Sequence, residues 1–141
     1  MQIPSPILAA VALFVAVTPA LALDTWADTV QRGLRALSLK TADGELRLYC
    51  DPARVFGPDS NANVAVEFAK DADPTMVVFL AKTGEQARLA VKDGHAFQTQ
   101  TDAAEWSKMV EMVKAGGSFA IVTSKASLKV ETAPVPDLAC Q

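Results

Sequence analysis

Few side chains in this chain of 141 residues belong to types that commonly carry out chemistry. His95 is the single histidine, and it directly follows Asp93-Gly94, a dipeptide typical of a tight turn. A catalytic histidine needs a nucleophile and an orienting partner, and the sequence has no Gly-x-Ser-x-Gly elbow to supply them. We therefore expect His95 to be an exposed turn residue, and we predict no catalytic residue.

Metal ligands are equally scarce. One histidine cannot build a zinc site when the only cysteines, Cys50 and Cys140, pair with each other. Residues 59–63 begin like a calcium loop, but Val64 and Lys70 stand where such a loop needs glycine and glutamate. We predict neither a metal nor another cofactor.

The candidate binding residues are an aromatic side chain near the N-terminus and parts of the polar stretch 51–63. This stretch contains two prolines and a glycine, so it is predicted to be a loop. Long loops on a β scaffold often carry binding residues. The predicted contact residues are Trp26, Arg54, Phe56 and Asn61. Alternatively, the loop covers a hydrophobic edge of its own domain, with Val55 and Phe56 packing inward.

The first 22 residues have the layout of a secretory signal peptide. Residues 7–17 are apolar, no side chain before Asp24 is charged, and Ala20-Leu21-Ala22 is a small-residue cleavage box. A retained membrane anchor is the alternative. A spanning helix needs about 20 apolar residues, and Pro19 interrupts this run near its end. We expect cleavage after Ala22, which leaves one domain over 23–141.

Export would place Cys50 and Cys140 in an oxidising compartment, where an even number of cysteines indicates a disulfide. A bond across a loop of this length stabilises a fold by about 4–5 kcal/mol in the chain-entropy model. It would also fix the C-terminus, because Cys140 is the penultimate residue. Two free thiols are the alternative.

The charged residues exclude two classes of partner. The chain has 13 Lys and Arg against 16 Asp and Glu, a net charge of −3, and no basic block. Nucleic acid and anionic lipid surfaces attract clustered positive charge. We therefore expect no nucleic-acid partner, and no stable membrane insertion once the signal peptide is removed.

Alternating apolar residues and turn dipeptides predict about eight short strands. They are expected at 37–41, 46–50, 63–68, 76–80, 88–92, 95–99, 118–123 and 127–132. Asp43-Gly44 and Asp93-Gly94 should each close a hairpin, because glycine tolerates the positive φ of such turns.

Two segments have less regular patterns. The continuous apolar run 76–80 is typical of a strand buried on both faces. The segment 23–35 is ambiguous: Asp24 could cap a short helix with Trp26, Val30 and Leu34 at helical spacing, although Gly33 weakens that interpretation.

One helix is expected from about residue 102 to residue 115. Asp102 can cap it, and Glu105 stands three residues later as in a capping box. Its apolar stripe consists of Trp106, Met109, Val110 and Val113. Gly116-Gly117 should end the helix.

These elements favour a mainly β fold, an antiparallel β-sandwich or open barrel with one α-helix in the C-terminal half. The order of helix, Gly116-Gly117, strand and closing strand, with an early strand 46–50 that ends in a cysteine, resembles small periplasmic β-sandwich domains of the invasion-associated locus B type. The chain departs from them in having only two cysteines and in ending with Pro134-Val135-Pro136. The resemblance implies an envelope location and no catalytic residue.

The sequence therefore predicts a periplasmic or secreted, non-enzymatic binding or accessory domain that contacts an envelope protein or a small ligand. Two alternatives stay open. The chain could be a hydrolase or hydrolase inhibitor acting through the 51–63 loop. It could instead be a signal-anchored accessory subunit of a membrane complex that retains residues 7–23.

Overall fold

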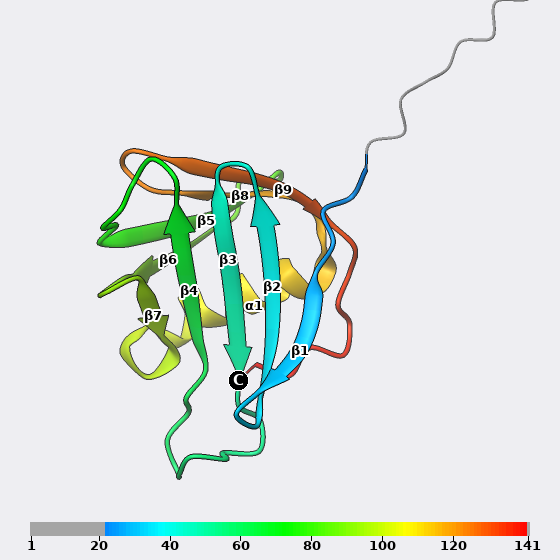
Figure 1. Cartoon of the computed structure of the whole chain (residues 1–141), viewed down its shortest axis with the longest axis vertical. Helices are drawn as coiled ribbons and strands as arrows, with labels where there is room; N and C mark the ends of the chain where they lie inside the picture. Colours follow the sequence, from blue (N-terminus) through cyan, green and yellow to red (C-terminus); the bar gives the residue numbers. More distant parts are fainter. Residues whose placement is uncertain (1–21, 141) are drawn as a thin grey trace, which may run out of the picture.

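Alternating apolar residues build two antiparallel sheets, which form two layers whose strands run across one another (Figure 1). The computed structural model describes residues 22–140, so the predicted signal peptide lies outside the described residues except for Ala22. The first sheet has the order β1-β2-β3-β4-β7, with bounds Ala27–Gln31, Leu34–Thr41, Gly44–Cys50, Asn63–Phe68 and His95–Phe97. The second has the order β6-β5-β8-β9, with bounds Gln86–Ala90, Met76–Ala81, Gly117–Val122 and Ser127–Thr132.

The helix α1, Ala103–Ala115, lies behind the first sheet and beside the second (Figure 1). A 3-10 turn, Gln98–Gln100, connects β7 to it. No helix among residues 22–140 is long and apolar enough to cross a membrane.

The hydrophobic core lies between the inner faces of the sheets and α1. Its largest side chains include Leu37, Leu39, Leu46 and Leu48 from the first sheet, Phe79, Leu89, Ile121 and Leu128 from the second, and Trp106 and Met109 from α1. None of them is more than 1% exposed. Removal of this apolar surface from water is the main term that stabilises the fold.

The predicted fold class is confirmed: the domain is mainly β, with two antiparallel sheets and one helix in its C-terminal half. Residues 22–140 contain nine strands where the sequence predicts about eight. The additional strand is β1, which lies in the ambiguous segment 23–35.

The short helix considered for residues 23–35 is wrong. Arg32 and Gly33 have positive φ values of 50° and 83° and form a turn that pairs Gln31 with Leu34. Asp24 caps no helix: its N–H donates to the Glu131 carbonyl over 2.7 Å, and its carboxylate accepts from the Glu131 N–H over 2.9 Å. Asp24 thus fixes the first described residues to the edge strand β9.

One of the two predicted hairpins is confirmed in full. The pairing of β2 with β3 extends to Thr41 and Gly44, so the chain turns at residues 42 and 43. The turn at Asp93-Gly94 also forms, with φ values of 52° and 78°. Lys92 and His95 exchange both backbone hydrogen bonds across this turn, over 2.9 and 3.0 Å, so the second hairpin begins as predicted. The pairing stops after this one pair, because β6 belongs to the second sheet and β7 pairs with β4 in the first. The turn therefore carries the chain from one layer to the other.

The predicted helix is confirmed, with a different role for Glu105. The Asp102 carboxylate accepts from the N–H groups of Ala104 and Glu105, as a cap should. Glu105 accepts from the backbone N–H of Arg88 over 2.6 Å and from Lys108 over 2.8 Å. The helix therefore satisfies a backbone group of the edge strand β6. Its end at Gly116 is as predicted.

The predicted disulfide joins Cys50 to Cys140, and both residues are fully buried. It links the end of β3 to the C-terminal segment, which Figure 1 shows returning to the first sheet. The Trp106 Nε1–H donates to the Cys140 carbonyl over 2.6 Å. The bond and the helix therefore hold the same end of the chain.

Candidate functional site

A hollow of about 520 Å³ opens on the outer face of the first sheet, and we call it the aromatic hollow. Its lining consists of Gln31, Arg32, Leu34, Tyr49, Phe56, Asn61, Asn63, His95 and Phe97. Its volume is within the range of about 300–1,000 Å³ typical of small-molecule sites. Apolar surface with a few positioned polar groups is the composition of sites that bind and orient a small ligand.

Strand register aligns the central side chains of the aromatic hollow. Tyr49 on β3 pairs with Asn63 on β4, and Asn63 pairs with Phe97 on β7. Side chains alternate along a strand, so these three residues lie on the outer face, where Asn63 is only 9% exposed, while Leu48 and Val64 are buried in the core. Directly opposite side chains on paired strands are about 5 Å apart. Tyr49, Asn63 and Phe97 therefore form one row across the sheet.

His95 shares this face of β7 with Phe97, and the two rings stack with centroids 5.9 Å apart and an interplanar angle of 24°. The expectation that His95 is an exposed turn residue is wrong, since it begins β7 and is half-buried. The cause is the pairing of β7 with β4, which places His95 directly opposite Ala65.

A chain of hydrogen bonds runs from the aromatic hollow into the 51–62 loop. Asn63 Oδ1 lies 3.1 Å from His95 Nδ1, and Asn63 Nδ2 donates to the Asn61 carbonyl over 2.9 Å. Asn61 Nδ2 donates to Asp51 Oδ2 over 3.2 Å, and Asp51 Oδ1 accepts from the Val55 N–H over 2.9 Å. Because the amide nitrogen of Asn63 points to Asn61, its oxygen faces His95. Neutral His95 therefore carries its proton on Nδ1 and offers Nε2 as an acceptor.

Asp51 accepts the last two hydrogen bonds of this series, from Asn61 and Val55, and it is only 2% exposed. The hydrogen bond from the Val55 N–H holds the pKa of Asp51 below its ordinary value of 3.8; burial opposes this effect, and the amide of Asn61 adds to it. A carboxyl group with a lowered pKa in the folded state stabilises the fold above its ordinary pKa, and that stability is lost as the pH falls through the lowered value.

We expect the Asp51→Asn variant to show a shallower loss of stability than the wild-type protein as the pH falls below the ordinary carboxyl pKa of 3.8. Asparagine does not titrate, and its amide nitrogen would face the amide nitrogen of Asn61. The measurement is the urea midpoint as a function of pH, with Asp59→Asn, an exposed position in the same loop, as the control. Equal pH dependence in all three proteins would show that Asp51 does not hold the loop.

The structure brings together two of the four predicted contact residues. Phe56, which is 57% exposed, and Asn61 both line the aromatic hollow. Arg54 is exposed in the loop but is not part of the lining. Trp26 is partly buried and packs against the hydrophobic core. Inward packing of Val55 and Phe56 is wrong, because Val55 is also 49% exposed.

Sequence reasoning missed Tyr49, Asn63, His95 and Phe97 as site residues. Each occupies an outward position in an alternating strand, which is a weak signal available in the sequence. The alternating pattern does not show which strands are neighbours in the sheet. The row of Tyr49, Asn63 and Phe97 forms only because β7 pairs with β4.

A smaller, charged hollow adjoins the aromatic hollow, and His95 lines both. It contains Glu45, Glu67 and Asp93, with Arg47 among them. Arg47 lies 2.7 Å from Glu45 and 3.6 Å from Glu67. Its hydrogen bond lowers the pKa of Glu45. The charged hollow, on one side of His95, therefore has a net negative charge. The aromatic hollow, on the other side, has one charged lining residue, Arg32.

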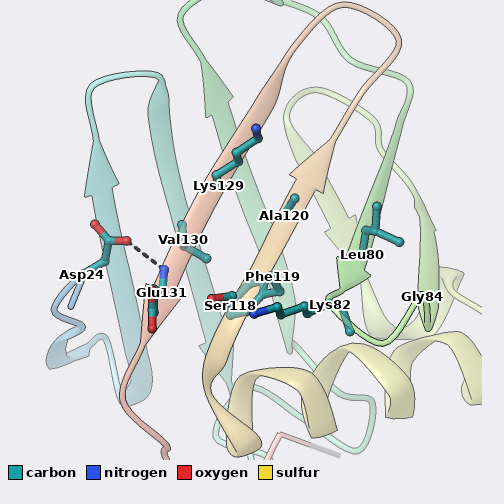
Figure 2. A pocket seen from close by; sticks show the side chains of 11 residues that line it. Asp24, Leu80, Lys82, Gly84, Ser118, Phe119, Ala120, Lys129, Val130 and Glu131 are labelled. Atoms are coloured by element: carbon teal, nitrogen blue, oxygen red, sulfur yellow. Dashed lines mark hydrogen bonds between the residues drawn. The ribbon is translucent and has the colours of Figure 1, made fainter. Parts of the chain in front are cut away.

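Another hollow, of about 650 Å³, lies on the outer face of the second sheet (Figure 2). Leu80 and Ala120 contribute apolar surface from β5 and β8, and Lys129 and Glu131 come from β9. The hydrogen bond drawn in Figure 2 joins Glu131 to Asp24, where it fixes the N-terminal segment. This 650 Å³ hollow is the larger of the two, but we take the aromatic hollow as the candidate site because side-chain hydrogen bonds link its polar groups Asn61, Asn63 and His95.

The prediction that residues 76–80 are buried on both faces is wrong. Val77 and Phe79 are 0% exposed in the core, whereas Met76 is 50% exposed. Val78 and Leu80 are only partly buried. The apolar run forms β5, whose outer side chains lie on the uncovered face of the second sheet.

Comparison with known proteins adds no relative: no family model, curated protein or solved structure matches the chain. The candidate site therefore stands on its geometry.

Proposed function

We propose that this protein is an exported, non-enzymatic binding domain that holds a small ligand in the aromatic hollow. The observation that carries the proposal is the row of Tyr49, Asn63 and Phe97 on three neighbouring strands. Hydrogen bonds to Asn61 and His95 fix the amide of Asn63 within that row. Such fixed groups lower the entropic cost of ordering a site when a ligand binds.

Export is supported from two sides. A disulfide between Cys50 and Cys140 indicates an oxidising, non-cytoplasmic compartment. Leu23 is 52% exposed, and among the described residues backbone hydrogen bonding to the domain begins at Asp24. A cut after Ala22 would remove none of the backbone hydrogen bonds described for residues 24–140. The proposal includes a periplasmic or secreted location. It also includes the resemblance to domains of the invasion-associated locus B type.

Ligand-observed NMR against a library of sugars, amino acids, nucleobases and short peptides tests the binding function. We expect ligands whose affinity falls at least about tenfold in the Phe97→Ala variant, because the variant removes an aromatic surface of the hollow. Met76→Ala is the matched control, since Met76 is an exposed apolar residue on the other sheet. Affinity lost in the control and kept in Phe97→Ala would contradict the proposed site.

The same experiment separates binding from hydrolysis. If the wild-type protein converts a bound compound to product and His95→Asn does not, the hydrolase alternative replaces the binding function. We expect each bound compound to be recovered unchanged.

A further inference from the structure

We propose that the ligand of the aromatic hollow is a short glycan that carries a single carboxylate, bound with its acidic group at Arg32. This inference rests on the proposed function and names its ligand class. It follows from the charge, the flat surfaces and the hydrogen-bonding groups of the hollow.

The charges in and beside the hollow favour a ligand with an acidic group at one end. Arg32 is the only lining residue with a permanent charge, and it lies in the turn between β1 and β2. On the far side of His95 the surface carries the three carboxyl groups of Glu45, Glu67 and Asp93 against one guanidinium group, that of Arg47, so its net charge is negative. A ligand carboxylate would be attracted to the first end and repelled from the second. One acidic group at one end of the ligand is therefore favoured over several along its length.

The flat surfaces select a ring-shaped ligand with an apolar face. Phe97 is 37% exposed and Phe56 is 57% exposed, and the His95 ring extends the surface of Phe97. The exposed aromatic surface that the stacked pair and Phe56 leave can bury apolar ring surface of a ligand.

The polar groups select hydroxyl groups as partners. Gln31 contributes an exposed amide, Asn61 an amide oxygen, and neutral His95 an acceptor at Nε2, while the amide of Asn63 is 9% exposed and holds Asn61 and His95 in place. A hydroxyl group both donates and accepts, so it matches such a lining in either direction.

A peptide is the less suitable ligand. Peptides commonly bind to sheets by adding a strand at an open edge. Tyr49 and Asn63 in the lining belong to β3 and β4, which are paired on both sides; the edge strand β7 contributes only the side chains of His95 and Phe97 and is three residues long. Recognition on this face must come from side chains, which suits a ligand whose polar groups are distributed around a ring.

The test is isothermal titration with two acidic sugars, N-acetylmuramic acid and a disaccharide with one glucuronic acid unit, and with the methyl ester of each. We expect at least one acid to bind more tightly than its ester. We further expect Arg32→Gln to weaken binding of that acid about tenfold and to leave binding of the ester unchanged. Arg54→Gln is the matched control: Arg54 is also exposed, has nearly the same φ (53° against 50°) and does not line the hollow.

The possible failures are distinguishable. If neither acid binds, but a compound of another class binds and depends on Phe97, the glycan assignment is wrong and the binding function stands. If the acid and its ester bind equally, or if Arg54→Gln weakens the acid as much as Arg32→Gln does, the carboxylate is not held at Arg32. If no library compound depends on Phe97, both proposals fail.

Discussion

The Gly44→Ala variant is expected to lose about 3 kcal/mol of folding stability or more. A Cβ atom at Gly44 would overlap the carbonyl oxygen of Glu67 and would lie 3.1 Å from the Cα of Phe68. Both are backbone atoms of β4, so a side-chain rotation cannot relieve the contact. Gly44 begins β3 directly after the turn and pairs with Phe68 of β4.

Urea unfolding of the purified variants measures this effect. Gly84→Ala is the control, because Gly84 also has a positive φ, 91°, but a Cβ there would meet nothing within 4 Å. We expect that control to lose only about 1 kcal/mol, from backbone strain alone. Similar losses in both variants would mean that the approach of β4 to Gly44 is not as close as described.

Removal of the disulfide is expected to cost about 4 kcal/mol, because the bond joins residues 90 positions apart. It also holds the C-terminal segment, in which Leu138 is 5% exposed and the Cys140 carbonyl accepts from Trp106. We expect Cys50→Ala, Cys140→Ala and the double variant to lose nearly the same stability, since each abolishes one bond.

Chemical unfolding of the three variants under non-reducing conditions checks this prediction. Additive losses in the double variant would show that the two cysteines stabilise the fold independently of each other. Thiol titration of the native wild-type protein provides a second readout, and we expect no reactive thiol before unfolding and reduction.

The helix and most strands could be predicted because their signals are local. Asp102, the apolar stripe and Gly116 define α1 within a short segment, and the structure reproduces its bounds within one residue. The same holds for the hairpin of β2 and β3, where short loop length fixes the pairing. The disulfide followed from cysteine number and the predicted compartment.

The aromatic hollow could be predicted only in part because its formation depends on strand order. Phe56 and Asn61 belong to a loop with a visible composition, so they were predicted. His95 and Asn63 are 32 positions apart and meet only through the pairing of β7 with β4. Hydrophobic alternation tells which face a side chain occupies, but it contains no information on which strand lies next to it.

The uncovered side of β5 shows the same limit. Five consecutive apolar residues, 76–80, fit a strand covered on both faces. Nothing in the run says whether a layer exists to cover the second face. In residues 22–140 the helix packs beside the second sheet and against β6, and it leaves Met76 exposed.

Chemical-shift mapping of the ¹⁵N-labelled, disulfide-intact protein during titration with the tightest library ligand tests the central claim most directly. We expect the largest shifts at the amides of Tyr49, Asn63, His95 and Phe97, with small shifts at Leu80, Ala120 and Lys129 on the other sheet. Shifts concentrated on β5, β8 and β9 instead would contradict the assignment of the aromatic hollow as the binding site.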